Sequence, residues 1–315
     1  MAFGSNSQRA GVEWSSEVPQ IDVLVPSYQY GRFLPECINS IRSQDVDLRI
    51  LILDNASTDD SVEIARQLAS EDARIEVRTR ETNLGLMASF NEGVDWASSP
   101  YFAIVCADDL VAPGALSRAV RLLDDHPSAA FLIGRELEYI QDEPFPHIDQ
   151  SQPESWRMSR GVDFIDERCR NPASFVALGT LVTRTSVQKQ AGHYKAHLSY
   201  TEDVEMMLRL ASFGDVVETS AVQAIRRLHG KNMSNVYLKG RKSDLIYRKA
   251  AFDSFLDERG NALADPTCLR KTINRNIAIR AARWSARALL HGELGESWDL
   301  LRYAASVSSR LGARA

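Results

Sequence analysis

Two neighbouring aspartates, Asp108 and Asp109, follow directly after the short apolar run Tyr101–Cys106. The run is rich in aromatic and β-branched residues and comes after Pro100, which predicts a buried strand. Carboxylates at the end of such a strand lie at the carboxyl edge of a sheet, where open α/β proteins bind ligands. Because adjacent carboxylates repel each other and are costly to desolvate, the pair favours a bound cation. A divalent metal that carries a phosphorylated substrate is the simplest candidate.

A plainer alternative is that the pair forms a solvated turn, or caps a helix that starts near Pro113. Carboxylates are common in turns and at helix starts, so the two aspartates taken alone favour this alternative. The choice therefore depends on which other residues reach the same edge of the sheet.

Polar side chains follow the other predicted strands in the same way. Pro26 ends the first strand and Tyr28 comes next, which places an aromatic ring at the sheet edge. Asp54 follows the second strand, where a carboxylate can accept hydrogen bonds from a base or a ribose. Asn83 leads into the third helix. These positions predict one ligand site built from several strand ends, although Tyr28 could instead belong to the core.

A second acidic pair, Glu202 and Asp203, opens a helix much later in the chain, and His229 follows a later strand. Carboxylates at a helix start interact favourably with the helix dipole. On the residues alone, a structural role and a catalytic role for this pair are therefore equally supported. A single histidine such as His229 is more often a satisfied structural residue than a ligand.

Alternating strand and helix patterns place these residues. The apolar runs 21–25, 49–53, 75–79 and 101–106 predict strands, and a helical pattern with one apolar face follows each of them. Four such units within about ninety residues predict an α/β fold with a doubly wound, mostly parallel sheet and right-handed crossovers.

The pattern changes in the second half of the chain. We expect a strand at 129–140 that bends near Gly134, a long functional loop at 141–160 with Trp156 isolated in it, and a strand at 179–184. A helix at 202–213 and a strand-like segment at 216–228 follow, and the pattern is helical from about 236 onward. These changes predict three parts, listed as a loose lead at 1–18, a catalytic or binding domain at 19–235 and a helical region at 236–315.

Composition narrows the function classes. The 315 residues carry a net charge of −5, which offers no overall basic field for nucleic acid. The four cysteines are far apart, without metal-ligand or redox spacing, as in a reducing compartment. The polar start at 1–20 has no apolar signal region, and no apolar run approaches the length of a membrane span. We therefore expect a cytoplasmic protein that could still contact a membrane surface.

The tail from Thr267 onward is the one region with a basic excess, with nine Lys and Arg residues against three Asp and Glu residues. On a helical wheel, arginines flank an apolar stripe; the stripe comprises Ile273, Ile277, Ala281, Trp284 and Ala288, and the flank Arg280, Arg283 and Arg287. One interpretation is a helix on an anionic membrane surface. The other, slightly favoured, is a helix packed on its own domain with solvated arginines.

Six motifs in order resemble the inverting nucleotide-sugar glycosyltransferases of family 2, which have the GT-A fold. The resemblance covers about residues 20–235 and leaves out the tail. The motifs are Val25-Pro26-Ser27-Tyr28, Leu53-Asp54-Asn55-Ala56-Ser57-Thr58-Asp59, Asn83-Leu84-Gly85 through Asn91-Glu92-Gly93, Cys106-Ala107-Asp108-Asp109, Thr201-Glu202-Asp203, and Arg227-Leu228-His229-Gly230-Lys231-Asn232-Met233-Ser234. Each motif is weak alone, whereas six in this order are specific.

The resemblance implies a role for each matching residue. Tyr28 and Asp54 would hold the nucleotide base, with Pro26 and Asn83 in the same pocket, and Asp108 would contact the ribose. Asp109 would ligate Mg²⁺ or Mn²⁺ on the diphosphate, and His229 would help to hold the diphosphate and the metal. Asp203 would be the catalytic base, with Glu202 beside it.

Two positions depart from the family pattern. Cys106 stands where the family often has an acidic residue, and a thiol is a poor ligand for a hard cation. Asp108 and Asp109 must then suffice, together with phosphate oxygens and water. Asn55 replaces a frequent aspartate, which leaves Asp54 as the expected contact to the base.

The chemistry expected from these residues is sugar transfer with inversion. A divalent ion neutralises the charge that builds on the diphosphate, and a fixed carboxylate takes the proton of the acceptor hydroxyl. The expected substrates are a nucleoside-diphosphate sugar, a UDP-sugar first, and a sugar or lipid-linked acceptor, in polysaccharide or glycoconjugate synthesis. The expected partners include no nucleic acid, and the C-terminal helices could touch a membrane.

Two other functions remain open on the sequence. A nucleotidyltransferase would share an acidic metal site on a similar sheet, but it needs a glycine-rich basic phosphate loop, and the segment Pro26–Gly31 is poor in both features. A non-catalytic nucleotide- or carbohydrate-binding module would have no need of Asp203.

Overall fold

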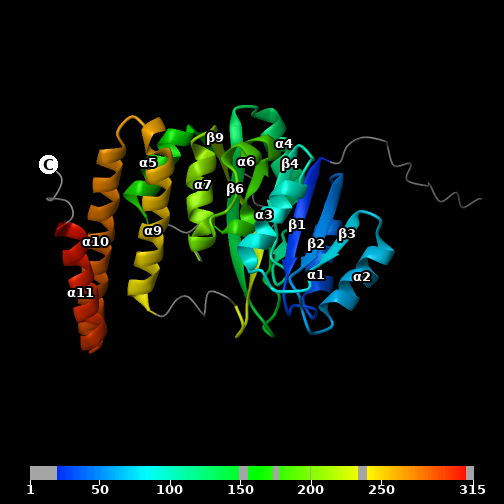
Figure 1. Cartoon of the computed structure of the whole chain (residues 1–315), viewed down its shortest axis with the longest axis horizontal. Coiled ribbons are helices and arrows are strands. Elements are labelled where there is room, and N and C mark those ends of the chain that lie inside the picture. Colours follow the sequence, from blue (N-terminus) through cyan, green and yellow to red (C-terminus); the bar gives the residue numbers. More distant parts are fainter. Residues whose placement is uncertain (1–19, 149–154, 173–176, 199, 233–239, 310–315) are drawn as a thin grey trace, which may run out of the picture.

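The first half of the chain alternates strands and helices, as the sequence predicts. The structure is a computed structural model that describes residues 20–148, 155–172, 177–198, 200–232 and 240–309, so the predicted lead at 1–18 lies outside it (Figure 1). The elements of this half are β1 (Ile21–Ser27), α1 (Leu34–Arg42), β2 (Leu48–Asp54), α2 (Ser61–Glu71), β3 (Ile75–Thr79), α3 (Leu86–Trp96) and β4 (Tyr101–Ile104).

These strands pair in parallel, β3 with β2, β2 with β1 and β1 with β4. Every residue of β1 is buried, and its side chains alternate between two hydrophobic clusters, with Val23 in one and Leu24 in the other. A strand covered by helices on both faces is mostly apolar, which explains the nearly continuous apolar runs.

The first strand does not stop at Pro26, contrary to the sequence expectation, and β1 continues to Ser27. Proline lacks an N–H group and breaks a strand only where that group is needed for pairing. The pairing of β1 with β4 ends at Leu24 opposite Ile104, so no neighbour on that side needs the missing donor. Pro26 still lies opposite Leu53 of β2.

The second half extends the sheet with mixed pairing. Its elements begin with β5 (Leu110–Val111), α4 (Ala115–Asp125), β6 (Ala129–Ile140), β7 (Trp156–Ser159), α5 (Gly161–Arg170), β8 (Val182–Arg184), α6 (Thr185–Ala191), α7 (Glu202–Ala211) and β9 (Asp215–Leu228). The strand order is β3-β2-β1-β4-β8-β6-β9-β5, and β7 pairs with β9. Strand β6 runs parallel to β9, whereas β8, β5 and β7 pair antiparallel.

The predicted bend near Gly134 is present, because the register of β6 against β9 shifts between Ile133 and Arg135. A Cβ atom on Gly134 would lie 2.3 Å from the Gln223 side chain and 3.0 Å from the Ala221 carbonyl oxygen. The bulge therefore brings the two backbones closer than any other residue would allow.

Two predicted segments differ from the structure. Residues 156–159 of the expected loop form β7, whose Trp156 lies opposite Thr219 and packs its ring on His126 at 4.4 Å between centroids. The expected strand at 179–184 is a 3-10 turn at Leu178–Thr180 followed by the three-residue β8. Strand β7 forms by pairing antiparallel with β9, and β8 by pairing antiparallel with β4. Neither pairing is visible in the local sequence, which explains both differences.

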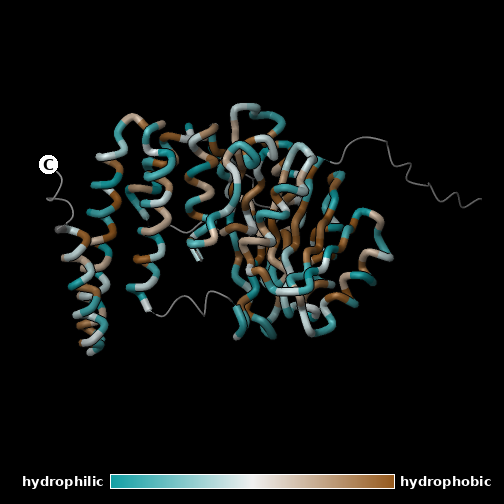
Figure 2. Tube along the Cα trace, in the orientation of Figure 1, coloured by the Kyte–Doolittle hydropathy of each residue, from teal (hydrophilic) through white to brown (hydrophobic). Residues whose placement is uncertain are grey.

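Helices cover both faces of the sheet. One face packs on α1, α2 and α4, and the other on α3, α5 and α7. The C-terminal helices α9 (Arg241–Arg259), α10 (Pro266–Leu290) and α11 (Leu294–Ser309) extend the second cluster outward from α7 (Figure 1). Apolar residues concentrate in the strands between these layers (Figure 2). Within the described ranges, no helix is both long and apolar enough to cross a membrane.

The end of the sheet opposite the strand-end aspartates is fixed by a buried carboxylate, Asp22, whose side chain has no exposed area. It accepts two hydrogen bonds from Arg49 at 2.8 Å, and others from the backbone N–H groups of Ser98 and Ser99 and from the Ser99 hydroxyl. Burial alone raises the pKa of Asp22, but these donors outweigh it, so the pKa lies below the ordinary 3.8. Asp22 thus ties β1 to β2 and to the loop before β4.

Replacing Asp22 by alanine should lower the free energy of unfolding by about 3 kcal/mol, because buried donors lose their acceptor while Arg49 stays partly in water. Since the folded pKa is depressed, this stabilisation is present at neutral pH and is lost as the pH falls below about 4. Urea unfolding at pH 7 and at acid pH measures both effects. An equal deficit at both pH values would contradict the assigned ion pair.

Candidate active site

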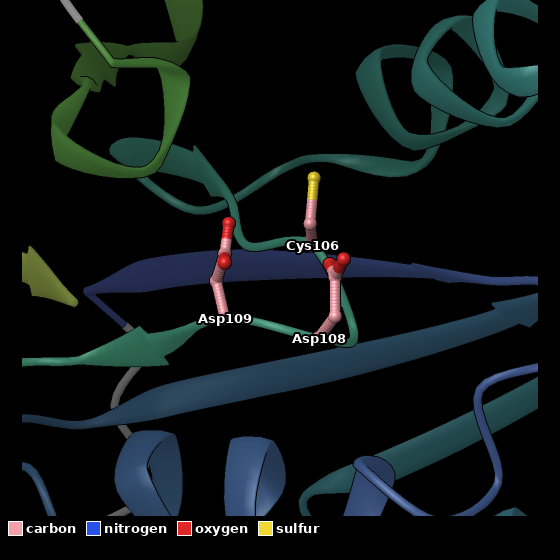
Figure 3. Close-up of side chains that lie close together, drawn as sticks. All are labelled: Cys106, Asp108 and Asp109. Carbon is pink, nitrogen blue, oxygen red and sulfur yellow. The ribbon is translucent and has the colours of Figure 1, made fainter. Parts of the chain in front are cut away.

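The two strand-end aspartates lie in the short segment that joins β4 to β5. The side chains of Cys106, Asp108 and Asp109 point to the same side of this segment, and their potential ligand atoms all lie within 4.8 Å of one another (Figure 3). Because β5 pairs with β9, the segment is held against the carboxyl-terminal part of β9. The structure therefore gathers these three side chains into one cluster.

Asp109 is fixed by the backbone. Its Oδ1 accepts a hydrogen bond from the Arg227 N–H at 3.0 Å, and its own N–H donates to the Cys106 carbonyl oxygen at 2.9 Å. Burial and the neighbouring charge of Asp108 raise the pKa of Asp109 well above its ordinary value, although the Arg227 N–H opposes the shift. No hydrogen bond from the described residues reaches Asp109 Oδ2, so one carboxylate oxygen remains available to a ligand.

Asp108 is buried and is held by side chains from the segment after β9. Its Oδ2 lies 3.1 Å from His229 Nε2 and 3.4 Å from Asn232 Nδ2. Asn232 Oδ1 in turn accepts the His229 backbone N–H at 2.6 Å. Asp108 and its two polar neighbours thus form a connected network at the edge of the site.

His229 reaches Asp108 but is not one of the clustered ligand groups. The Lys231 backbone N–H donates to His229 Nδ1 at 3.2 Å, so the ring proton is on Nε2 and faces Asp108. Rings of Tyr30 and Phe33 pack on the imidazole, with centroids at 5.7 Å and 4.8 Å. In this arrangement both ring nitrogens have protein partners, and His229 orients Asp108.

Arg227 organises the aspartate segment, a role that the sequence analysis did not assign. Besides its backbone bond to Asp109, its Nε donates to the Asp108 carbonyl oxygen at 3.0 Å. The Nη2 atom of Arg227 pairs with Glu36 at 2.5 Å, and the guanidinium carbon lies 4.9 Å from the Phe33 ring centroid. Arg227 is only 5% exposed, so it supports the aspartate segment from inside the protein.

Asp54 ends β2 and shapes the loop that follows. Its Oδ1 accepts the Ser57 N–H at 2.8 Å, whereas its buried Oδ2 has no donor among the described residues. Gln29 joins this loop to the one after β1, because its N–H donates to the Ser57 hydroxyl at 2.9 Å. The carboxyl ends of β1 and β2 therefore form one continuous rim.

The remaining predicted nucleotide contacts lie along this rim. Tyr28 follows β1 with 45% of its surface exposed, whereas Pro26 is buried inside the strand. Asn83 is exposed in the loop before α3, and its Oδ1 accepts from Asn55 Nδ2 at 2.7 Å and from the Gly85 N–H at 2.8 Å. Asn55 therefore serves as a link between loops.

The second acidic pair sits at the start of α7, where a third carboxylate provides a comparison. Glu205 is fully buried and is paired with Arg209 at 2.7 Å and with Lys195 at 3.0 Å. Glu202 and Asp203 are 8% and 9% exposed, and neither lies within 4 Å of a cationic group of the described chain. Glu205 is thus a structural ion pair, whereas Glu202 and Asp203 are buried acids without one.

The buried environment raises the pKa values of both acids toward neutral pH. Burial raises the pKa of Asp203 to about 6, against a lowering by the Val204 N–H and by the charge of Arg248. Burial and the Asp203 charge raise the pKa of Glu202 to about 8. Because the two carboxyls interact, they lose their protons in two steps, and the lower value of Asp203 favours it as the group that ionises first. A carboxylate ionised next to a neutral acid is suited to accept a proton.

Electrostatic contacts join the two acidic groups across the sheet edge. The charge of Glu202 acts on Cys106, and Glu136 of β6 interacts with both Asp109 and Asp203. Burial raises the pKa of Glu136 to about 7, and Arg226 opposes the shift. Glu136 had no signal in the sequence, because it is one polar residue within a strand, and only the register of β6 against β9 brings it here.

The ligand atoms of this cluster suit a hard divalent cation. Asp108 and Asp109 present carboxylate oxygens at one point, which Mg²⁺ and Mn²⁺ prefer. Burial and the charge of Asp109 raise the pKa of the Cys106 thiol well above its ordinary value, so this group stays protonated. The chain therefore offers two carboxylates, and a cation here needs further oxygens from substrate and water.

Trp156 lies away from this site. Its partner Thr219 precedes Arg227 on β9 by eight residues, which is about 26 Å along a strand. Trp156 packs on His126 at the other end of the sheet, so its ring does not line this site.

Comparison with known proteins places the chain among sugar-transferring enzymes. Residues 22–188, more than half of the chain, match the model of a family described as glycosyl transferase family 2. An uncharacterized glycosyltransferase of Haemophilus influenzae is 26% identical over 225 residues, covering 70% of this chain and 68% of the relative. The putative glycosyltransferase EpsE of Bacillus subtilis is 26% identical over 281 residues, covering 86% and 90%.

Solved structures share the fold. TarS of S. aureus, in complex with UDP-GlcNAc, superposes with a TM-score of 0.58 at 15% identity, over 93% of this chain and 92% of that chain. The mannosyltransferase PcManGT of Pyrobaculum calidifontis, in complex with GDP-Man and Mn²⁺, gives 0.57 at 15% identity, over 95% and 88%. Both likenesses extend over the helical tail and confirm the predicted fold class.

Proposed function

Since the chain belongs to glycosyl transferase family 2, and is therefore a glycosyltransferase, we propose that it moves a sugar from a nucleoside-diphosphate sugar to an acceptor hydroxyl with inversion. The observation that carries this proposal is the pair of buried acids at the start of α7, Glu202 and Asp203, which lack ion-pair partners in the described chain. The charge of Glu202 acts on Cys106 of the aspartate segment, and Glu136 interacts with both Asp203 and Asp109. We propose a UDP-sugar as donor, and a sugar or lipid-linked acceptor in polysaccharide or glycoconjugate synthesis in the cytoplasm.

The donor would lie along the rim formed by the ends of β1, β2 and β4. Tyr28 would stack on the base, Asp54 would accept hydrogen bonds from it, and Asp108 would accept from the ribose. Support comes from the exposed ring of Tyr28 and the undonated oxygen of Asp54. The structural neighbours named above hold UDP-GlcNAc and GDP-Man, which supports a nucleotide-sugar donor without choosing the base.

Asp109 would hold Mg²⁺ or Mn²⁺, with Asp108 beside it. The bound ion would supply charge neutralisation on the diphosphate leaving group. Arg227 fixes Asp109 through its backbone N–H, and His229 holds Asp108 in place. His229 contributes by orienting this carboxylate, and the role toward the diphosphate and the metal that the family resemblance implies stays a prediction.

Asp203 would act as the base. In a single displacement, the acceptor oxygen bonds to the anomeric carbon as the bond from that carbon to the diphosphate oxygen breaks. The hydroxyl proton passes to Asp203, and the nucleoside diphosphate leaves with the electron pair. Glu202, which keeps its proton at neutral pH, would orient the acceptor or the start of the helix.

A panel of nucleotide-sugars, scored by thermal shift with and without Mn²⁺, tests the donor assignment. A true donor at 100 times its dissociation constant should stabilise the protein by about 2.7 kcal/mol, and more with Mn²⁺ than without it. The panel should select one sugar and one base. Equal stabilisation by nucleoside triphosphates alone would point to nucleotidyl transfer, and donor binding without transfer to any acceptor would point to a binding module.

A further inference from the structure

Four of the five residues of the apolar stripe predicted on the tail helix are buried inside the protein. Ile273, Ile277, Ala281 and Ala288 of α10 have no exposed surface, and the first three belong to the hydrophobic cluster that includes α9 and α11. These four residues cannot contact a membrane, so the packed-helix interpretation holds for them, whereas the fifth, Trp284, is only half-buried. The arginine flank of the same helix is a separate surface.

That flank forms a cleft. Arg280, Arg283, Trp284 and Arg287 line a cavity of about 350 Å³, and the Arg280 guanidinium lies 5.5 Å from the centre of the Trp284 ring. Residues spaced by three, four and seven positions share one face of a helix, so the three cations point to the same side. We call these four residues the arginine cleft.

The arginines of the cleft have no acidic partner in the described parts of the chain, unlike their neighbours. Arg270 of the same helix pairs with Asp253 and Asp257 of α9. The acids nearest in sequence are already engaged, because Arg241 pairs with Glu293 and Glu296. The cleft therefore carries uncompensated positive charge on a protein whose net charge is −5.

Exposed apolar side chains lie on the same helical hairpin as the cleft. Leu290 lies three residues after Arg287 on the same helix face and is 86% exposed. Across the turn into α11, Leu294 and Trp298 are 66% and 60% exposed, and Leu301 continues their row. Cations beside exposed Leu and Trp are the composition of surfaces that lie in a lipid headgroup layer.

We propose that the arginine cleft and the apolar row on the same hairpin dock this protein on an anionic membrane surface, with the arginines around lipid phosphates and Leu290 and Trp298 at the headgroup boundary. Charge complementarity selects this occupant. A symmetric contact of this patch with its own copy would bring six arginines, three from each copy, into one interface. The hairpin of α10 and α11 forms the outer end of the molecule, with α9 between it and α7, so the surface is far from the proposed donor site (Figure 1).

Co-sedimentation of the full chain with vesicles tests the proposal. Vesicles of phosphatidylcholine with phosphatidylglycerol should bind the protein, pure phosphatidylcholine should bind it weakly, and added salt should reduce the binding. The triple variant Arg280→Gln, Arg283→Gln, Arg287→Gln should lose roughly 100-fold in affinity, since each arginine near an anionic surface contributes about fivefold. Leu290→Ser with Trp298→Ser should weaken binding to the same vesicles.

A matched control removes the same charge away from the proposed surface, by Lys271→Gln and Arg275→Gln on another face of α10 and Arg66→Gln on α2, and should keep most of the binding. Equal losses in both triple variants would show a net-charge effect and overturn the assigned cleft. Thermal stabilisation by inorganic phosphate without vesicle binding would make the cleft a site for soluble anions. Concentration-dependent dimers abolished by Trp298→Ser, again without vesicle binding, would make the surface a contact between copies. Donor-induced thermal shifts should be unchanged in all variants, which separates this test from that of the proposed function.

Discussion

Replacing Asp109 by asparagine should abolish the Mn²⁺-dependent part of the stabilisation by a nucleoside diphosphate and lower kcat/KM by at least about 100-fold. Asparagine keeps Oδ1 as an acceptor for the Arg227 N–H, so the segment should hold its shape. What is lost is the negative charge beside Asp108, and a hard cation binds a neutral amide oxygen more weakly than a carboxylate. A bound ion contributes several kcal/mol to a charged transition state, and each 1.4 kcal/mol is tenfold in rate.

The neighbouring thiol provides the matched control. Cys106 belongs to the same cluster, but its raised pKa keeps it protonated, so Cys106→Ser should retain metal-dependent binding and activity. Thermal shift with UDP across a Mn²⁺ titration, together with initial rates, measures both variants. Unchanged metal dependence in Asp109→Asn would remove the ion from this segment, and loss in Cys106→Ser would require a thiolate ligand that the structure does not favour.

The sequence predicted the first half of the fold well because its signals are local. Strands buried on both faces are mostly apolar, and each helix shows its own periodic face, so β1 to β4 and their helices follow from short windows of sequence. Pro26 is the exception, since its effect depends on where β4 leaves β1. The three-residue β8 and the four-residue β7 exist through their partners and carry little local signal.

The same distinction applies to the candidate site. Asp54, Asp108 and Asp109 could be placed at the sheet edge because each follows a strand, whatever the rest of the fold does. Arg227 and Glu136 could not, because pairing of β9 with β5 and with β6 brings them to residues more than twenty positions away. Their positions next to the aspartates depend on the register in which β9 pairs with β5 and β6, which no local stretch of sequence reveals.

The pattern of charged residues in the sequence leaves the roles of the α7 acids and of the two α10 faces open, and the packing in the structure decides both. Three acids occur in the first turn of α7, and the sequence does not say which of them is structural. The ion pairs of Glu205 with Arg209 and Lys195 separate it from the other two. In α10 the helical wheel identified the apolar stripe and the arginine flank. Packing buries most of the stripe and leaves the arginines at the surface.

Asp203→Asn should lower turnover by roughly 100-fold or more while leaving donor and metal affinity nearly unchanged. The amide keeps the shape and the hydrogen-bonding capacity of the side chain but cannot take a proton, and a general base is worth about 10²–10⁴-fold. The loss should appear in kcat, because the interaction is needed only as the hydroxyl attacks. Glu202→Gln should lose less, since Glu202 already keeps its proton at neutral pH.

Two further measurements separate a base at Asp203 from a helix cap. The base must be ionised, so the parent rate should rise with pH through about 6, the raised pKa of Asp203, and the residual rate of Asp203→Asn should lack this step. The raised pKa also means that the folded state binds more protons between about pH 4 and 6, so ionisation destabilises the fold as the pH rises through that window. Asparagine cannot ionise but still accepts from the Val204 N–H, so Asp203→Asn should melt no lower than the parent at pH 7, whereas Asp203→Ala, which loses that acceptor, should report any capping contribution as a lower melting temperature. Full transfer activity in the variant would place the base elsewhere, and a collapse of donor binding would assign Asp203 to the nucleotide pocket.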